Sequence, residues 1–214
     1  MTLNIAIFSD LICPWCFIGK RRLSKAISLL DEKSEFYTAW YPFQLNPQMP
    51  PEGMDRKVYR TAKFGSWSKS LKLDAQVVEV GATEGIHFAF DRIQRTPNTL
   101  NAHRLVWLAG KEGIQDALVE ALFQSYFTQG KDISDRSILI DIAQRTGLSS
   151  ANVESLFYSG EGVEAVCQEE EKARQLKIGG VPLFIVNGKF GLSGAQLPNV
   201  FIALFEKVMQ LEND

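Results

Sequence analysis

The stretch that decides the fold is Leu3–Cys16, with the sequence LNIAIFSDLICPWC. Its first part, Leu3–Phe8, is apolar or β-favouring and predicts a strand. The chain then turns, and Pro14 suits the first turn of a helix, where its missing N–H costs nothing. The stretch therefore predicts a strand that leads into a helix, with the two thiols of Cys13-Pro14-Trp15-Cys16 at the junction.

The residues that follow extend this pattern to a β-α-β unit. Leu23, Ile27 and Leu30 recur at helical spacing, so we expect the helix to run to about Leu30. Phe36–Tyr41 is rich in aromatic and β-favouring residues and predicts a second strand. This order of elements predicts a parallel pair of strands joined by a crossover helix.

Strand patterns return only near the end of the chain. Leu183–Val186 and Lys189–Leu192 flank Asn187-Gly188, which is a strong hairpin signal, and an amphipathic helix follows from about Leu197. Residues 54–159 show helical patterns almost throughout. We therefore predict an α/β protein in which residues 1–50 and 164–214 form one domain around a shared sheet, while residues 51–163 form an inserted helical domain.

The composition is that of an ordinary globular protein, with 45% hydrophobic and 22% charged residues among 214. A net charge of −2 gives no argument for a nucleic acid or membrane surface as partner, and no apolar run approaches the roughly 20 residues of a membrane span. The N-terminal residues enter the strand without a basic segment, so we expect no signal peptide and a cytoplasmic location. A homodimer is compatible with these features.

The cysteine pair is the candidate source of chemistry. Three cysteines do not make a disulfide framework, so a close pair is expected to be catalytic or metal-binding. Cys13 lies at a predicted helix N-terminus, where unpaired N–H groups and the helix dipole favour the negative charge of an attacking thiolate. Cys16 lies one turn further, and such side chains are roughly 5–6 Å apart, close enough to form a disulfide. Cys13 is thus the candidate nucleophile and Cys16 the resolving residue, with Pro14 and Trp15 as tuning residues.

Zinc is the main alternative for this pair. A structural zinc site normally has four cysteine or histidine ligands. Besides the pair, the chain offers only Cys167, His87 and His103, at spacings that match no common zinc pattern. We therefore predict redox chemistry and no metal site, with an idle reduced pair as a further alternative.

Gly180-Val181-Pro182 is a second motif, placed just before the predicted strand Leu183–Val186. A proline here cannot donate to a sheet ladder. From the residues alone, it is a proline at the start of a strand, with the trans peptide bond that is usual for proline.

Together these motifs resemble the DsbA-like thioredoxin family. Ser9–Cys16, Asn98–Leu105, Gly180–Phe184 and Gly191–Gln196 are similar to its FrnE branch, and the resemblance covers essentially the whole chain. It implies a thioredoxin fold with an inserted all-helical domain. It also implies a protein disulfide oxidoreductase or isomerase without a bound cofactor, acting on protein thiols and disulfides or on glutathione.

The resemblance also assigns roles near the second motif. It implies that Pro182 is cis and faces Cys13. It further implies that Val181 offers its backbone to an extended substrate peptide, so that main-chain hydrogen bonds give affinity with little demand on sequence.

A related branch supplies the rival function. Kappa-class glutathione transferases and 2-hydroxychromene-2-carboxylate isomerases share the architecture, but usually carry serine in place of Cys13 and lack the second cysteine. The presence of both thiols favours dithiol exchange over a glutathione-dependent isomerase or transferase. In the rival, aromatic residues of the insertion would wall a pocket for a small hydrophobic molecule, although such residues more often form core: Phe64, Trp67, Phe88, Phe90, Trp107 and Phe123. A non-enzymatic binding module with incidental cysteines is the third alternative.

Five other features have more ordinary explanations. Asp10 would relay the proton of Cys16, but we favour a turn or helix-capping role. We expect His103 to be a packed structural histidine rather than a cleft residue, and Cys167 to be a small buried apolar residue. Lys20-Arg21 would add positive potential near the thiols, but a solvated helix face is favoured. We predict a second solvated face with i,i+4 pairs around Glu169–Arg174.

Overall fold

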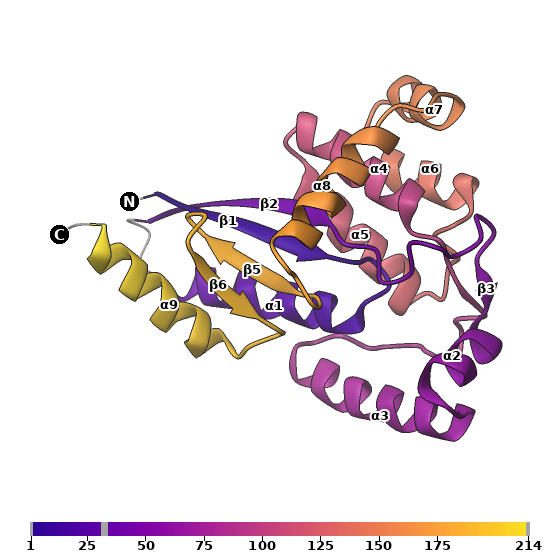
Figure 1. Ribbon diagram of the computed structural model, residues 1–214, viewed down its shortest axis with the longest axis horizontal. Helices are drawn as coiled ribbons and strands as arrows, with labels where there is room; N and C mark the ends of the chain where they lie inside the picture. The colour runs from indigo at the N-terminus through magenta and orange to yellow at the C-terminus, as the bar shows by residue number, and fades with distance from the viewer. Residues whose placement is uncertain (1, 31–33, 213–214) are drawn as a thin grey trace.

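The computed structural model describes residues 2–30 and 34–212, in which strands from both ends of the chain form one sheet. Its order is β2-β1-β5-β6 (Figure 1). The four strands are β1 (Thr2–Ser9), β2 (Glu35–Pro42), β5 (Leu183–Val186) and β6 (Phe190–Ser193). β1 runs parallel to β2 and antiparallel to β5, and β5 runs antiparallel to β6. The expected parallel pair and the C-terminal hairpin are therefore both present.

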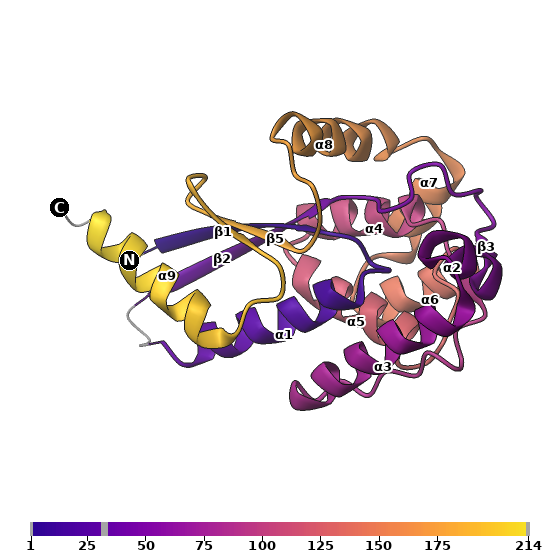
Figure 2. The same cartoon turned by 60° about the horizontal axis from the view of Figure 1, so that its bottom comes forward.

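Helices cover both faces of this sheet. α1 (Pro14–Ser28) and α9 (Pro198–Leu211) pack together on one face, and α8 (Val163–Gln175) lies on the other (Figure 2). α1 begins where the sequence predicts it and ends near the predicted position. The hairpin turn has positive φ at Asn187 (48°) and Gly188 (67°), the conformation that Asn-Gly favours between antiparallel strands.

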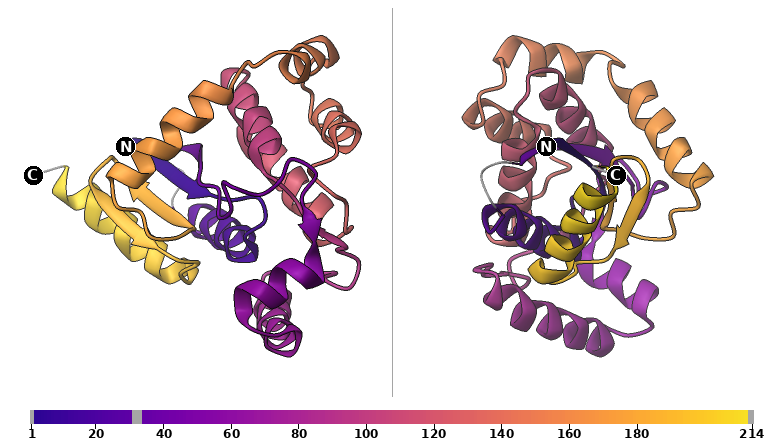
Figure 3. Two further views of the ribbon diagram at one scale, coloured as in Figure 1. Left: turned by 45° about the vertical axis from the view of Figure 1, so that its right-hand side comes forward. Right: turned by 90° about the vertical axis from the view of Figure 1, so that its left-hand side faces the viewer.

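The segment between β2 and α8 is mainly helical, as predicted. Its helices are α2 (Arg56–Phe64), α3 (Trp67–Thr83), α4 (Leu100–Lys111), α5 (Gln115–Phe127), α6 (Arg136–Arg145) and α7 (Ser150–Tyr158). α2 and α3 pack together and α3 reaches α1 (Figure 3). The segment also contains a short antiparallel pair, β3 (Met54–Asp55) with β4 (Arg95–Thr96). The sequence missed it because strands this short carry no periodic signal. The domain boundaries at residues 50/51 and 163/164 stay a prediction.

An aromatic cluster joins α1 to the insertion. The ring of Phe17 stacks on Phe123 of α5 at a centroid distance of 5.1 Å and on Phe127 at 6.3 Å. All three side chains are fully buried. Phe123 is therefore core, as is usual for such residues, and the first turns of α1 are fixed against both the sheet and the insertion.

The solvated face predicted for Lys20-Arg21 is wrong. Lys20 is only 5% exposed, and its Nζ lies 2.9 Å from Asp116 and 3.2 Å from Glu120. Arg21 pairs with the same Glu120 at 2.5 Å. The acidic residues lie one turn apart on α5, which packs over α1, so the two cations hold the insertion instead of adding free positive potential near the thiols.

Gly19 allows α1 to approach the strand that follows the Val181-Pro182 motif. A Cβ atom at this position would lie 3.1 Å from both Phe184 Cζ and Pro182 Cγ. Such a distance is tighter than ordinary van der Waals contact, so a larger side chain would push the motif away from the helix that carries the thiols.

We expect Gly19→Val to lower the free energy of unfolding by about 1–3 kcal/mol, the usual cost of overpacking a well-packed site. The matched control is Gly191→Val, because a Cβ at Gly191 in β6 would meet nothing within 4 Å among the described residues. Urea denaturation of both variants tests this. Equal stability of the two variants would show that α1 and the motif are not in tight contact.

Candidate active site

The two cysteines lie on the first turn of α1. Cys13 is the N-cap residue, with extended backbone angles (φ −92°, ψ 110°), and the helix begins at Pro14. The N–H of Cys16 donates to the carbonyl of Cys13 at 3.0 Å, and the N–H of Cys13 donates to the carbonyl of Asp10 at 3.0 Å. Both are free thiols and both are buried, with exposed fractions of 5% for Cys13 and 1% for Cys16.

The Val181-Pro182 motif lies against Cys13, although 168 residues separate Val181 from Cys13. The Cys13 thiol donates to the carbonyl oxygen of Val181 at an Sγ–O distance of 3.6 Å. The Val181–Pro182 peptide bond is cis, in place of the trans bond that the residues alone favour. The carbonyl of Pro182 accepts from the N–H of Gly194 at 2.8 Å, which ties the motif to the segment after β6.

Cys16 is the more protected sulfur. Burial raises its pKa well above the ordinary thiol value, and the hydrogen bond and charge of the neighbouring Cys13 raise this pKa further. The side chain of Ser9 and the backbone of Asp10 act in the opposite direction and lower this pKa, because donor groups near the sulfur favour its charged form. Cys16 is therefore a thiol at neutral pH, whose deprotonation depends on nearby donors.

Asp10 does not cap α1. Its side chain is fully buried, and its Oδ2 accepts from the N–H of Leu45 at 2.7 Å. Its Oδ1 lies 3.3 Å from Nε2 of His103, which is 4% exposed. The helix-capping interpretation is thus wrong, because the carboxylate points across the turn to the loop after β2 and to α4. His103 is the buried, hydrogen-bonded histidine that the sequence predicts.

A cavity of about 350 Å³ opens beside the motif. Residues 12–15 line one side of it, and Trp15 is 39% exposed there. α2 and α3 line the other side. Of the six aromatic residues of the insertion considered above, only Phe64 lines this cavity. The predicted aromatic wall is therefore largely absent from this cavity, because most of those side chains pack elsewhere.

Charged and polar groups line this cavity together with aromatic and aliphatic side chains. Arg56 and Arg60 each contact Asp74 at 2.6 Å. Lys63 donates to Tyr59 at 2.6 Å, and Tyr59 donates to Oδ1 of Asn46 at 2.5 Å. The lining thus contains three cations and one carboxylate. No signal in the sequence distinguishes these residues. They come next to the cysteine motif only in the fold, through the loop after β2.

Nδ2 of Asn46, which belongs to the lining of the cavity beside Cys13, is buried and has no hydrogen-bond partner within the described chain. A buried amide donor without a partner is uncommon in native proteins. This donor is therefore available to an acceptor group of a ligand.

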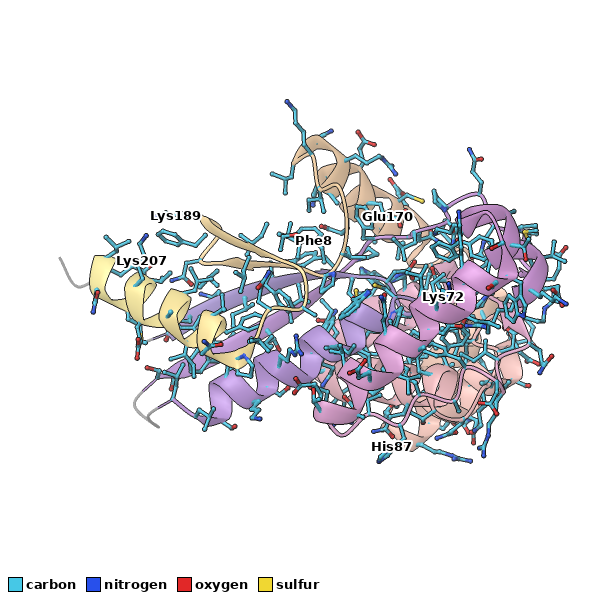
Figure 4. All side chains as sticks on the ribbon, turned by 90° about the horizontal axis from the view of Figure 1, so that it is seen from below. Phe8, Lys72, His87, Glu170, Lys189 and Lys207 are labelled. Carbon is cyan, nitrogen blue, oxygen red and sulfur yellow. The ribbon has the colours of Figure 1, made fainter. Side chains whose placement is uncertain are left out.

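The prediction for Cys167 on α8 is wrong, and the predicted solvated face around Glu169–Arg174 is present except at Glu170 and with a different pair spacing. Cys167 is exposed, because the buried face of α8 carries Val166, Glu170 and Ala173 at helical spacing, and Cys167 lies beside that face. Glu170 is 7% exposed (Figure 4) and accepts from the N–H of Gln44 at 2.7 Å. The ion pairs on the exposed side are i,i+3, between Glu169 and Lys172 and between Glu171 and Arg174.

Residues 2–30 and 34–212 contain neither a metal-binding cluster nor a membrane-spanning helix. No group of three or more His, Cys, Asp or Glu side chains in these ranges is placed to hold a metal ion. No helix in them is long and apolar enough to cross a membrane.

The chain belongs to the DSBA-like thioredoxin domain family, whose model matches residues 4–205. The thioredoxin fold with a helical insertion is therefore confirmed. The uncharacterized protein YwbO of Bacillus subtilis is 28% identical over 202 residues, 94% of each chain. The crystal structure of the probable DsbA oxidoreductase SCO1869 from Streptomyces coelicolor is 27% identical, with a TM-score of 0.88 over 97% of this chain and 90% of that one.

More distant structures share the fold. The cytosolic disulfide reductase DsbM from Pseudomonas aeruginosa, in a structure with glutathione, is 17% identical, with a TM-score of 0.69 over 97% of this chain and 99% of that one. A 2-hydroxychromene-2-carboxylate isomerase is 15% identical, with a TM-score of 0.75 over 99% and 98% of the two chains. Structures of this fold thus include disulfide oxidoreductases as well as an isomerase of the rival branch. Membership of the FrnE branch stays a prediction.

The raised pKa of Cys16 makes a prediction about stability. A folded-state pKa above the unfolded value contributes stability that is present at neutral pH and lost as pH rises above about 9, the ordinary value for the thiol. We expect the free energy of unfolding of the reduced protein to fall more steeply above this pH than that of Cys16→Ala. Urea denaturation across the range from about pH 7 to about pH 10 measures both slopes. Parallel curves for the two proteins would contradict the assignment.

Proposed function

We propose that this protein is a thiol–disulfide oxidoreductase or isomerase in which Cys13 attacks and Cys16 resolves. The observation that carries the proposal is the contact of 3.6 Å between the Cys13 thiol, at the start of α1, and the carbonyl of Val181, beside a cis proline. A thiol at a helix N-terminus, next to a backbone segment that can hold an extended chain, supports the role of attacking group for Cys13. Family membership and the likeness to a DsbA oxidoreductase support it.

The proposed reaction has two displacement steps. The Cys13 thiolate attacks one sulfur of a substrate disulfide, forms a mixed disulfide and releases the other half of the substrate as a thiolate. Cys16 then attacks the sulfur of Cys13, so that a Cys13–Cys16 disulfide forms and the second half of the substrate leaves. The substrate gains two electrons and the pair loses two; the reverse sequence oxidises a dithiol.

The residues around the pair have supporting roles in this proposal. Val181 and Pro182 hold the substrate backbone against Cys13. Pro14 and Trp15 present the pair to the substrate, since Trp15 lines the adjoining cavity. Asp10 tunes Cys16 through its backbone, while its carboxylate is held by Leu45 and His103. We place the reaction in the cytoplasm, and the description of the structural neighbour DsbM as a cytosolic disulfide reductase supports this part of the proposal.

The three cysteines give the first functional prediction. We expect Cys13→Ser to abolish reduction of insulin by dithiothreitol-recycled protein, because the attacking sulfur is lost. Cys16→Ser should instead accumulate mixed disulfides through Cys13. Cys167→Ser is the matched control and should keep full activity, because Cys167 lies on α8, outside the site. Full activity of Cys13→Ser would contradict the mechanism, as would adducts of Cys16→Ser that survive loss of Cys13 in a protein that also carries Cys167→Ser.

We infer that glutathione is a co-substrate of the same pair. The cavity beside Cys13 carries three cations against one carboxylate, and Nδ2 of Asn46 is a buried donor without a partner among the described residues. Glutathione offers carboxylates and amide carbonyls next to a thiol, and it is present in the DsbM structure. A glutathione-dependent isomerase or transferase is the alternative use of this cavity, and would proceed without the second thiol.

The glutathione prediction uses two lysines. We expect Lys63→Ala to raise the half-saturating concentration of glutathione disulfide in oxidation of the reduced pair by about fivefold, which corresponds to the roughly 1 kcal/mol of one partly exposed charge contact. Lys72→Ala is the control, because it removes a charge on α3 (Figure 4) and Lys72 is not part of the cavity lining.

Identical half-saturation of the two lysine variants would exclude this cavity as the glutathione site. Turnover of a small hydrophobic substrate that depends on glutathione and survives Cys16→Ser would favour the isomerase or transferase instead.

A further inference from the structure

Ser9 carries a buried hydroxyl that the fold does not use. Ser9 is the last residue of β1 and is 3% exposed. Its backbone carbonyl accepts from the N–H of Phe43 at 3.0 Å, but its Oγ has no hydrogen-bond partner within the described chain. Buried polar side-chain atoms in native proteins nearly always have a partner, so an orphan next to reacting groups calls for a functional explanation.

The neighbour of this hydroxyl is the sulfur of Cys16. The side chain of Ser9 is close enough to Cys16 Sγ to lower the pKa of this thiol, as is the backbone of Asp10, but the Ser9 hydroxyl makes no hydrogen bond to the sulfur while the thiol is protonated. Cys13, on the same turn of α1, is the titratable group that acts on this sulfur. A protonated thiol is a weak hydrogen-bond acceptor for a serine hydroxyl, whereas a thiolate is a strong hydrogen-bond acceptor.

Burial decides how much this donor matters. Cys16 is 1% exposed, so water cannot solvate its negative charge. The charge that forms when Cys16 loses its proton must be met by donors of the protein itself. Cys13 is in a different position, because its thiol contacts the carbonyl of Val181, which is an acceptor. The Ser9 hydroxyl at the end of β1 is therefore a candidate donor for Cys16, whereas Val181 offers Cys13 an acceptor.

We propose that the Ser9 hydroxyl stabilises the Cys16 thiolate by a hydrogen bond while Cys16 resolves the mixed disulfide on Cys13. The inference rests on the proposed function. The Cys16 thiolate attacks Sγ of Cys13, the bond from Cys13 to the substrate sulfur breaks, and the substrate leaves as a thiolate. The proton lost by Cys16 balances the one gained by the departing thiolate. Ser9 keeps its own proton throughout, and in the reverse direction it stabilises Cys16 as the leaving group.

A chromogenic aryl disulfide separates the two steps, because each attack releases one coloured aryl thiolate. Cys167→Ser serves as the parent protein, since Cys167 is exposed and would react as well. In the reduced parent, the first release reports attack by Cys13 and the second reports attack by Cys16. We expect Ser9→Ala to slow the second release about tenfold, the loss expected for one hydrogen bond to a charged group, and to leave the first unchanged.

Ser9→Thr and Ser9→Val form the matched pair, because they have the same shape and differ in the hydroxyl. We expect Thr to keep a faster second release than Val, whatever crowding the added methyl group causes. Equal second releases in these two variants would overturn the inference, as would an equal slowing of both releases in Ser9→Ala. A parent protein that shows no second release would instead contradict the proposed function itself.

Discussion

The site depends on the antiparallel pairing of β5 with β1. Phe8 lies opposite Leu183 and Ile7 opposite Phe184, so the end of the first strand meets the start of the strand that follows the cis proline. This register is fixed by burial, because a slip of one residue would turn Phe184 from the core to the other face. Phe201 packs edge-on against Phe184 at 4.8 Å and secures the pair from α9. Without this pairing, the strands would not hold Cys13 and Val181 in contact.

α1 connects this strand pairing to the insertion. Gly19 lets it contact Pro182 and Phe184 on the sheet side, while Phe17 and Lys20 fix it to α5 of the insertion. Its N-terminus therefore lies where the sheet, the motif and the insertion meet, and the cavity beside Cys13 has walls from both parts of the chain. The same junction buries Cys16. The site therefore combines a cavity beside Cys13 with a buried sulfur that must complete the reaction.

Local signals in the sequence were enough for the β-α-β start, the hairpin and the position of the thiols, because each depends on neighbours a few residues apart. Roles that depend on a distant partner were not predictable. Lys20 and Glu170 look like solvated charges in sequence, but each is buried by a partner from another element. Cys167 looks apolar, but lies beside the buried face of α8. The orphan atoms of Ser9 and Asn46 carry no sequence signal at all, since only the packed fold shows what they lack.

The central claim is that Cys13 and Cys16 form a redox couple with separate roles. The most direct measurement is the mass and thiol content of Cys13–Cys16 peptides after equilibration of the protein in buffers of varied reduced and oxidised glutathione. We predict a single two-electron transition in which the pair alternates between dithiol and an internal disulfide, and its replacement by a stable glutathione adduct on Cys13 in Cys16→Ser. A pair that stays reduced across the series, or that forms adducts only, would contradict the account.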